Sequence, residues 1–448
     1  MSKATDRHSL RVDLSRLKSD ILTLARIGRH EDNRGIYRMA FTDADMEGKQ
    51  WLRERIEAAG LECRTDGAAN VSGTLSGLKE LPTVVVGSHI DTVPCAGTLD
   101  GSLGVLSALE CLRVMRENRV FPRRPIEVIS FTDEEGRFGG MFGSQAVCGL
   151  ISPESLYVRD LDDVTLANEM ERHGLDPLDA LGARRDPQSI HCYLELHIEQ
   201  GPVLDQTRKP AGIVDEITGL FKWAVRLHGV ANHAGTTPMD MRQDAFMGLA
   251  DFAHELPRII DENGGERSRA TIGKARIRPG AANTVPGLVE FSLDVRDTNA
   301  GILDDLSTAF RKALSAIARR RGLLFEFEEI SRIEPVPCSP SIVACLENAA
   351  SRLDIDALRM PSGAAHDAQI MASLCPVGMI FTPSQDGKSH TPAEWTSWSD
   401  IETAANLMLA ALLDLSEDEE PWETPTPPER AAVETERRPP PPRGSESE

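Results

Sequence analysis

Short segments of the chain carry the side chains that could do chemistry, and the first of them follows an apolar run. In the motif Gly-Ser-His-Ile-Asp-Thr-Val-Pro, His89 and Asp91 are two residues apart at the end of a strand-like sequence, so both side chains leave the same face. An imidazole whose second nitrogen is held by a carboxylate is typical of an oriented metal ligand. Asp100 follows in a turn beside Gly101 and adds a further carboxylate.

Other segments supply more carboxylates and imidazoles. The motif Asp-Glu-Glu-Gly-Arg contains Glu134 and Glu135, which point in different directions as neighbours, so that one can bind a metal while the other faces a substrate as a base. The motif Glu-Leu-His-Ile-Glu-Gln-Gly-Pro contains His197, and Ser-His-Thr-Pro-Ala-Glu contains His390. Alone, each also fits a structural role, because an isolated His-x-Asp is more often a satisfied polar pair and an isolated Glu-Glu is usually a solvated face.

Strand and helix patterns indicate how these segments are positioned. Runs of β-branched residues at 83–88 and 125–132 predict strands, and helical spacing of apolar residues over 103–118 predicts a helix between them. This order implies parallel strands in a sheet covered on both faces, with ligands bound at the carboxyl ends of the strands. We therefore expect the metal-ligand candidates to converge there: His89, Asp100, Glu135, His197 and His390. Such nitrogen and oxygen donors suit zinc, manganese, cobalt or nickel, and a central carboxylate can bridge two ions about 3.5–4 Å apart.

A second α+β unit interrupts this α/β domain. Alternating patterns predict strands at 221–229, 270–278 and 287–296, and helical periodicity marks 243–262 and 302–321. Together they predict an open-faced sandwich whose outer edge is open to pairing with a symmetric copy.

The predicted organisation has four parts. A catalytic domain with a mostly parallel central sheet covers 1–212 and 332–415, an inserted lid or dimerisation domain covers 213–331, and an acidic, proline-rich tail covers 416–448. We expect the tail to be disordered, because it cannot bury enough apolar surface to offset its ordering entropy.

Composition excludes several classes of protein. The chain has 448 residues, with 49 Lys and Arg against 70 Asp and Glu, and its net charge of −21 argues against a nucleic-acid partner. The absence of any long apolar run, of a signal segment and of a myristoylation motif predicts a cytoplasmic protein with no membrane partner. The eight cysteines are dispersed, which predicts reduced core thiols.

At these motifs the chain resembles the amidase/hydantoinase/carbamoylase family of dinuclear metal-dependent amidohydrolases, which belongs to the superfamily of aminoacylases and carboxypeptidases. The blocks that carry the resemblance are G-S-H-I-D-T-V-P, D-E-E-G-R-F, L-E-L-H-I-E-Q-G-P-V-L, A-N-H-A-G-T-T-P-M, G-A-A-N-T-V-P-G, V-R-D, S-G-A-A-H-D-A, and G-M-I-F-T-P-S with S-H-T-P-A-E. They span roughly residues 15–415 in the family's order. The resemblance implies a zinc-exopeptidase-like catalytic domain.

The resemblance also implies a metal centre. Two divalent metal ions per subunit, Zn²⁺ or else Mn²⁺, Co²⁺ or Ni²⁺, would be bridged by Asp100. His89 and His197 would complete one ion, and Glu135 and His390 the other. His197 stands where related peptidases often carry a carboxylate, which favours the carbamoyl-cleaving branch.

Catalytic and substrate residues follow from the same resemblance. Asp91 would orient His89, Glu134 would be the general base, and His233 would stabilise the oxyanion. The implied substrate-binding residues are Gln200, Asn283, Arg296, Ser362 and His366, with Arg296 taking the substrate carboxylate. The family commonly forms homodimers, in which His233 would reach the partner's metal centre.

The implied reaction is hydrolysis of an N-carbamoyl-L-amino acid to the amino acid, carbon dioxide and ammonia. Allantoate amidohydrolase and β-ureidopropionase are alternatives within the family, and a non-catalytic binding protein of the same fold is a more remote one. Each enzyme acts on a small ureido or amide substrate with a carboxylate. Ala96 and Ala365 stand where the family pattern has glycine.

Overall fold

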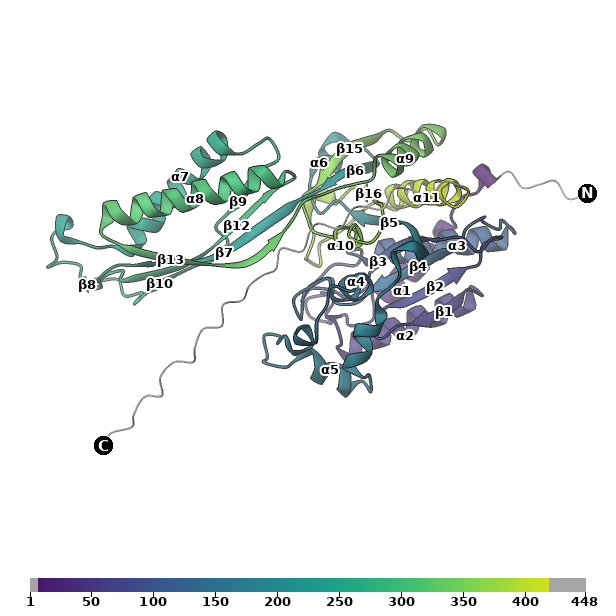
Figure 1. Ribbon diagram of the computed structural model, residues 1–448, viewed down its shortest axis with the longest axis horizontal. Helices are drawn as coiled ribbons and strands as arrows, with labels where there is room; N and C mark the ends of the chain where they lie inside the picture. Colours follow the sequence, from purple (N-terminus) through teal and green to yellow (C-terminus); the bar gives the residue numbers. More distant parts are fainter. Residues whose placement is uncertain (1–6, 419–448) are drawn as a thin grey trace, which may run out of the picture.

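The computed structural model describes residues 7–418, which form an elongated molecule of two bodies (Figure 1). The larger body contains a nine-stranded sheet, and a smaller body with a five-stranded sheet extends from it. Residues 419–448 of the predicted disordered tail lie outside the described residues, whereas Ser416 caps the last helix and accepts a hydrogen bond from the N–H of Arg124 (3.0 Å). Among the described residues, no helix is both long and apolar enough to cross a bilayer.

The nine-stranded sheet is parallel at its centre. Its strands lie in the order β1 (Glu62–Thr65), β2 (Val71–Leu75), β4 (Ile126–Phe131), β3 (Thr83–His89), β5 (Ile190–Ile198), β16 (Val377–Thr382), β6 (Ala211–Ile217) and β14 (Val336–Pro337), with β15 (Ala357–Ser362) also paired to β6. Strands β4, β3, β5 and β16 run parallel. Their side chains are buried nearly throughout, as expected for strands covered on both faces.

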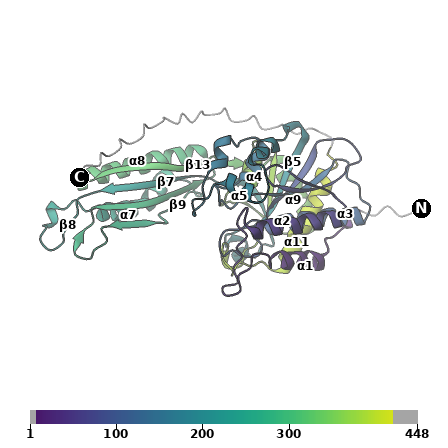
Figure 2. The ribbon, with the colours of Figure 1, turned by 90° about the horizontal axis from the view of Figure 1, so that it is seen from below.

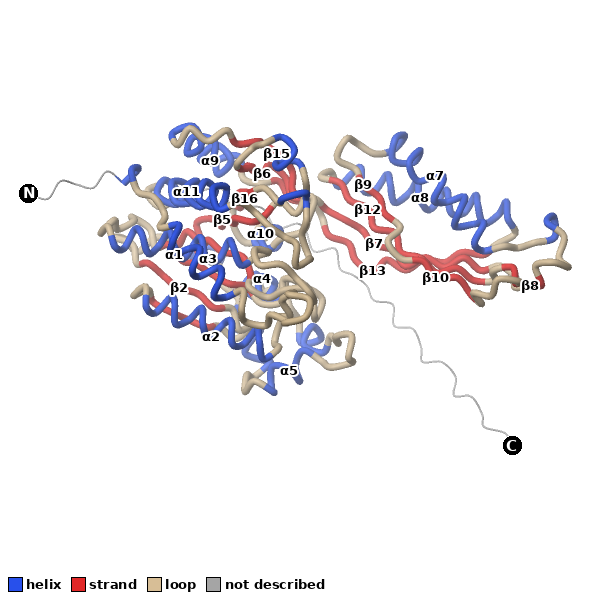
Figure 3. The backbone as a smooth tube through the Cα atoms, turned by 180° about the vertical axis from the view of Figure 1, so that it is seen from behind, coloured by secondary structure: helices blue, strands red, loops and turns tan. Residues whose placement is uncertain are grey.

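Helices cover this sheet and carry its connections. They are α1 (Leu14–Leu24), α2 (Asp43–Ala58), α3 (Ser102–Glu117), α4 (Phe142–Cys148), α5 (Leu166–Arg172), α6 (Val203–Thr207), α9 (Pro340–Arg352), α10 (Asp367–Met371) and α11 (Trp398–Leu415). Helix α3 packs on β3 and against α11, and α4 packs against α10 (Figure 3). The predicted strand, helix, strand unit is thus confirmed as β3, α3 and β4. All eight cysteines are free thiols.

The smaller body is an open-faced sandwich, as the sequence pattern predicts. Its antiparallel sheet contains β10 (Ala275–Arg278), β12 (Leu288–Asp297), β7 (Gly219–His228) and β13 (Leu324–Ile333), with β9 (Arg269–Thr271) paired to β12, and a separate ribbon joins β8 (Asn232–His233) to β11 (Thr284–Val285). Helices α7 (Ala245–Asn263) and α8 (Ala300–Arg321) lie over one face (Figures 1 and 3). Burial alternates along β12, so its other side chains face away from the helices.

The predicted domain boundary at residue 213 falls inside a strand of the larger sheet. Residues 213–217 belong to β6, which pairs with β15 and β16 in the larger sheet, and the smaller sheet starts with β7 at Gly219. An apolar, β-branched run predicts a strand but does not identify the sheet that the strand joins, because pairing depends on residues far away in the chain.

Candidate metal centre and substrate pocket

The carboxyl ends of parallel strands gather the predicted site residues. His89 is the last residue of β3, His197 lies near the end of β5, and the Glu134–Glu135 pair follows β4. Asp100 immediately precedes Gly101, the N-cap of α3, and His390 lies in the loop after β16. Because these strands are parallel neighbours, their ends lie at one edge of the sheet.

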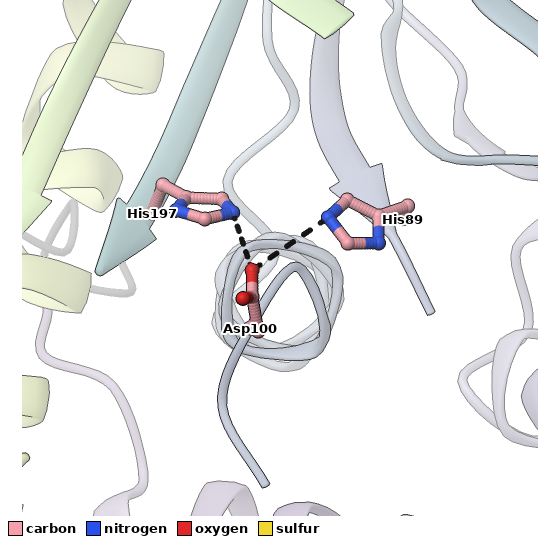
Figure 4. Close-up of side chains that lie close together, drawn as sticks. All are labelled: His89, Asp100 and His197. Carbon is pink, nitrogen blue, oxygen red and sulfur yellow. Dashed lines mark ion pairs between the residues drawn. The ribbon is translucent and has the colours of Figure 1, made fainter. Parts of the chain in front are cut away.

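Asp100 occupies the centre of the cluster. Its Oδ1 lies 3.1 Å from Nε2 of His197 and 3.9 Å from Nε2 of His89 (Figure 4). Its Oδ2 lies 3.2 Å from Nε2 of His390, which is 3.5 Å from Oε2 of Glu135. Each oxygen of one carboxylate therefore faces a different pair of potential ligands.

Two buried atoms of the cluster lack hydrogen-bond partners. Nε2 of His89 and Oε1 of Glu135 have none among residues 7–418. Potential ligand atoms lie within 4.8 Å of one another in His89, Asp100 and His197, and likewise in Asp100, Glu135 and His390. Buried polar atoms are normally satisfied, so these orphaned atoms and the nitrogen and oxygen donor set fit divalent metal ions.

The pKa shifts of the clustered side chains also fit a bound cation. Burial, followed by the charge of Glu135, raises the pKa of Glu134 well above its usual range, and burial followed by the charge of Asp100 does the same for Glu135. Burial opposes the shift at His197, but its hydrogen bond with Asp100 raises its pKa to about 9. A divalent cation would neutralise this concentration of buried carboxylates.

Asp91 contacts its neighbours differently from the expected arrangement. Nδ1 of His89 lies 3.0 Å from the main-chain oxygen of Asp91, whereas the nearer carboxylate oxygen is 3.8 Å away. The carboxylate instead accepts the main-chain N–H groups of Glu134 (3.3 Å) and Glu135 (3.2 Å). The expectation of a carboxylate on the ring assumed strand alternation, but β3 ends at His89, so Asp91 is free to face the next loop.

The base candidate lies beside the cluster. Oε2 of Glu134 is 3.4 Å from Nε2 of His89, and the side chain is 9% exposed. The preceding residue, Asp133, has a left-handed backbone (φ 56°), as do Gln200 (φ 59°) and His390 (φ 54°). Such conformations are uncommon for residues other than glycine and concentrate at functional sites.

A cavity of about 790 Å³ extends from the cluster toward the smaller body, and His390, Gln200, Ser362 and Arg296 line it. Nε2 of Gln200 donates to Oδ2 of Asp100 (2.9 Å). Arg296 of β12 donates to Asp294 (2.8 Å) and to the main-chain oxygen of Gly363 in the larger body (2.8 Å). The cavity therefore connects the metal-ligand candidates with a guanidinium group.

His366 contacts Ser362 and Phe381, two residues that line this cavity. It is buried, its Nε2 is 2.9 Å from Oγ of Ser362, and its ring centroid is 4.6 Å from that of His197. The structure thus brings together Gln200, Arg296, Ser362 and His366 around the predicted metal ligands.

His233 and Asn283 are far from this cluster within the chain. His233 lies in β8 and pairs with Thr284, and Asn283 accepts a hydrogen bond from the N–H of Ala234 through its main-chain oxygen (2.8 Å). Both side chains are exposed, and β8 lies at the end of the smaller body away from β3 and β5 (Figures 1 and 2). Neither residue lines the cavity.

Glu394 is a site residue that the sequence reasoning missed. Its carboxylate accepts the main-chain N–H groups of Leu99 (2.8 Å) and Asp100 (3.1 Å) and the hydroxyl of Ser389 (3.2 Å). Glu394 ends the motif Ser-His-Thr-Pro-Ala-Glu that contains His390, and this motif is the sequence feature that could have identified it.

Two alanines stand where the family pattern has glycine. The backbone accommodates both, because neither Ala96 nor Ala365 has a positive φ that would require glycine.

Comparisons with known proteins agree with this geometry. Residues 85–414 match peptidase family M20/M25/M40. An N-carbamoyl-L-amino acid amidohydrolase of Geobacillus stearothermophilus is 38% identical, over 90% of this chain and 99% of the relative. An allantoate amidohydrolase of Bacillus subtilis is 35% identical, over 88% of this chain and 95% of the relative. A crystal structure of a hydantoinase/carbamoylase family amidase from Burkholderia multivorans has a TM-score of 0.84 at 33% identity, covering 92% of this chain and 99% of that one.

The fold and the site define a hydrolase with a divalent-metal centre at the carboxyl edge of its main sheet. The chain belongs to peptidase family M20/M25/M40.

Proposed function

We propose that the protein is an N-carbamoyl-L-amino acid amidohydrolase, which hydrolyses its substrate to the amino acid, carbon dioxide and ammonia. The position of Arg296 carries this proposal, because the arginine lines the same cavity as His390. A substrate whose carboxylate contacts Arg296 can extend its ureido group toward the metal-ligand candidates. The relative from Geobacillus stearothermophilus, similar over nearly its whole length, supports this substrate class.

In this proposal each subunit holds two divalent ions, Zn²⁺ or else Mn²⁺, Co²⁺ or Ni²⁺. His89 and His197 would hold one ion, Glu135 and His390 would hold the other, and Asp100 would offer one carboxylate oxygen to each. The two oxygens of Asp100, which face different pairs of these residues, support the assignment.

The chemistry requires an activated nucleophile, because a ureido carbonyl is a poor electrophile. When bound, the ions lower the pKa of a coordinated water toward about 7 and polarise the carbonyl oxygen. Glu134 acts as the general base, taking a proton from the attacking water and delivering it to the leaving nitrogen. Its carboxylate lies beside His89, with Oε2 3.4 Å from Nε2 of the imidazole.

Substrate and oxyanion contacts complete the proposed site. Arg296 holds the substrate carboxylate, with Gln200, Ser362 and His366 around the pocket. His233 and Asn283 act in the partner subunit of a homodimer, where an imidazole donor to the oxyanion contributes about 3 kcal/mol. Their exposure, and their distance from the cluster of their own chain, support this arrangement.

A substrate panel tests the proposed function. The purified protein is freed of metal with a chelator, reloaded with Zn²⁺ or Mn²⁺, and assayed for ammonia release from N-carbamoyl-L-amino acids, N-carbamoyl-β-alanine and allantoate. We expect the highest kcat/KM for an N-carbamoyl-L-amino acid and no turnover by the metal-free protein.

Other outcomes of the panel contradict the proposal in different ways. A higher kcat/KM for allantoate or N-carbamoyl-β-alanine makes the protein a different amidohydrolase with the same centre. Binding of these compounds without turnover under any metal indicates a non-catalytic binding protein.

A further inference from the structure

Arg38 is a buried arginine that the proposed reaction does not use. It lies in the loop between α1 and α2 and is 1% exposed. Its Nε donates to the main-chain oxygen of Ile90 (2.7 Å), and one terminal nitrogen donates to the main-chain oxygens of Leu24 (3.0 Å) and Ile27 (2.9 Å). The other terminal nitrogen donates to Oγ of Ser102 (3.2 Å). The guanidinium therefore joins three separate segments of the chain.

This charge is buried without an ion pair. Among residues 7–418, Arg38 forms no salt bridge with a carboxylate within 4.0 Å, and burial lowers its pKa to about 10. Burying a cation without a direct counter-ion is costly, and here main-chain oxygens, a hydroxyl and the nearby charges of Asp45 and Asp91 compensate it. An apolar side chain would avoid that cost, so the hydrogen bonds themselves are what the position requires.

Those hydrogen bonds end beside metal-ligand candidates. Ile90 lies between His89 and Asp91, and the main chain of Arg38 also exchanges two hydrogen bonds with Thr92, one to its Oγ1 and one from its N–H (3.0 Å each). Arg38 therefore fixes the segment whose main-chain oxygen contacts the ring of His89. The carboxylate of Asp91 then holds the main chain of Glu134 and Glu135.

The hydrogen bond from Arg38 to Ser102 also connects it to the segment that carries Asp100. Ser102 is the first residue of α3, two residues after Asp100, and its N–H donates to the main-chain oxygen of Asp100 (2.6 Å). Arg38 thus links the start of α3 to the end of β3. The distance between these two elements sets the distance between Asp100 and His89.

We propose that Arg38 is a positioning residue for the metal centre. It holds the segment after His89 and the start of α3 at the separation that brings His89 and Asp100 together. This proposal rests on the metal centre of the proposed function, not on the identity of the substrate. A planar guanidinium has donors in a fixed fork, which lets one side chain satisfy acceptors on several segments, whereas a lysine ammonium is a compact charge that cannot span them.

The test compares two buried arginines. Arg124 is 2% exposed and likewise bonds to main-chain oxygens, those of Pro82 and Asp418, but it lies at the opposite ends of β3 and β4 from the site, about 20 Å away along strands of this length. Arg38→Lys and Arg124→Lys are assayed for Zn²⁺ and Mn²⁺ affinity by competition with a chelator, and for the Tm of the metal-free protein. Both variants remove an arginine fork while keeping a positive charge.

We expect both substitutions to lower the Tm of the metal-free protein, but only Arg38→Lys to weaken metal affinity, by about 10- to 100-fold, as loss of groups that hold ligands does elsewhere. Ser102→Ala is a milder second variant, because it removes the hydroxyl acceptor and leaves Arg38 in place. It should also weaken metal affinity, and by less, so the test does not depend on folding of the lysine variant.

Unchanged metal affinity in Ser102→Ala together with unchanged affinity in folded Arg38→Lys would overturn the positioning role. An equal loss of affinity in Arg124→Lys would also overturn it, since the effect would then be one of general stability. If the parent protein itself binds none of Zn²⁺, Mn²⁺, Co²⁺ and Ni²⁺, the proposed metal centre is wrong. That outcome is distinct from a parent that binds metal and variants that bind it equally well.

Discussion

Asp100 and His390 lie in contact at the carboxyl edge of the main sheet, with Oδ2 of the aspartate 3.2 Å from Nε2 of the histidine. Asp100 precedes α3 near the start of the chain, whereas His390 follows β16 near its end. This half of the cluster exists only because β16 pairs with β5 in the same sheet as β3.

His390→Ala should lose bound metal. In the proposed centre, removal of the imidazole would leave the second ion only the carboxylates of Asp100 and Glu135, so its affinity should fall while the ion assigned to His89 and His197 should remain. Metal analysis of the dialysed protein measures the change. His228→Ala, at a half-exposed histidine on the smaller body, is the matched control and should keep the metal content of the parent. Full metal content in His390→Ala would contradict the assignment.

Glu134→Gln should separate metal binding from turnover. The amide keeps the size of the side chain but cannot accept a proton, so kcat should fall about 10²- to 10⁴-fold at unchanged metal content. Metal analysis and ammonia release from one N-carbamoyl-L-amino acid check both parts. Near-parental turnover by a metal-loaded Glu134→Gln protein would remove the residue from the base role.

Arg296→Lys should weaken recognition of the substrate carboxylate. Loss of the planar two-point contact should cost about 1.5–3 kcal/mol in kcat/KM, the scale of a hydrogen bond to a charged group. The same substrate with its carboxylate amidated is the control, because parent and variant should then differ little. If the parent cleaves the acid and the amide equally well, Arg296 has another role, such as its contact with Gly363 between the two bodies.

Mixed dimers test the proposed sharing of the site. His233→Ala and Glu134→Ala, each inactive alone, are mixed in equal amounts under conditions that allow subunit exchange. Half of the dimers are then mixed, and each mixed dimer has one intact site of two, so activity should return to about a quarter of the parental level. Absence of recovery despite demonstrated exchange would assign His233 to its own subunit or to no catalytic role.

The packing of α7 against α8 should weaken at acid pH, because Asp251 of α7 is bonded to arginines of α8. Its hydrogen bond with Arg321, followed by that with Arg320, lowers the pKa of Asp251 to about 2, below its unfolded value of about 3.9. The interaction therefore stabilises the folded state above about pH 4 and is lost as the pH falls toward 2. Asp251→Asn should lower the free energy of unfolding in urea by about 0.5–1 kcal/mol at pH 6 and by less at pH 3.

Asp261→Asn provides the control for that measurement. Asp261 is an exposed aspartate on the same helix with no ion pair among residues 7–418, so its substitution should change stability little at either pH. If the free energy of unfolding differs between the parent and Asp251→Asn by the same amount at pH 6 and pH 3, the carboxylate charge of Asp251 is not what stabilises the helix pair.

Local patterns in the sequence predict individual elements and the candidate metal ligands beside them. The apolar run before His89 predicts a buried strand, and helical spacing predicts α3, because side-chain periodicity is a property of each element alone. The types of residue at the strand ends, imidazoles and carboxylates without thiolates, likewise indicate a metal centre before any contact is known.

The tertiary structure decided which atoms meet. It alone shows that the main-chain oxygen of Asp91 lies closer to the His89 ring than its carboxylate does, that 213–217 joins the larger sheet, and that His233 lies far from the cluster of its own chain. Arg38 carries no motif, and its role depends on Ile90 and Ser102 lying within reach of one guanidinium. These relationships involve segments distant in the chain, and their geometry is set by strand pairing and close packing, which local periodicity does not encode.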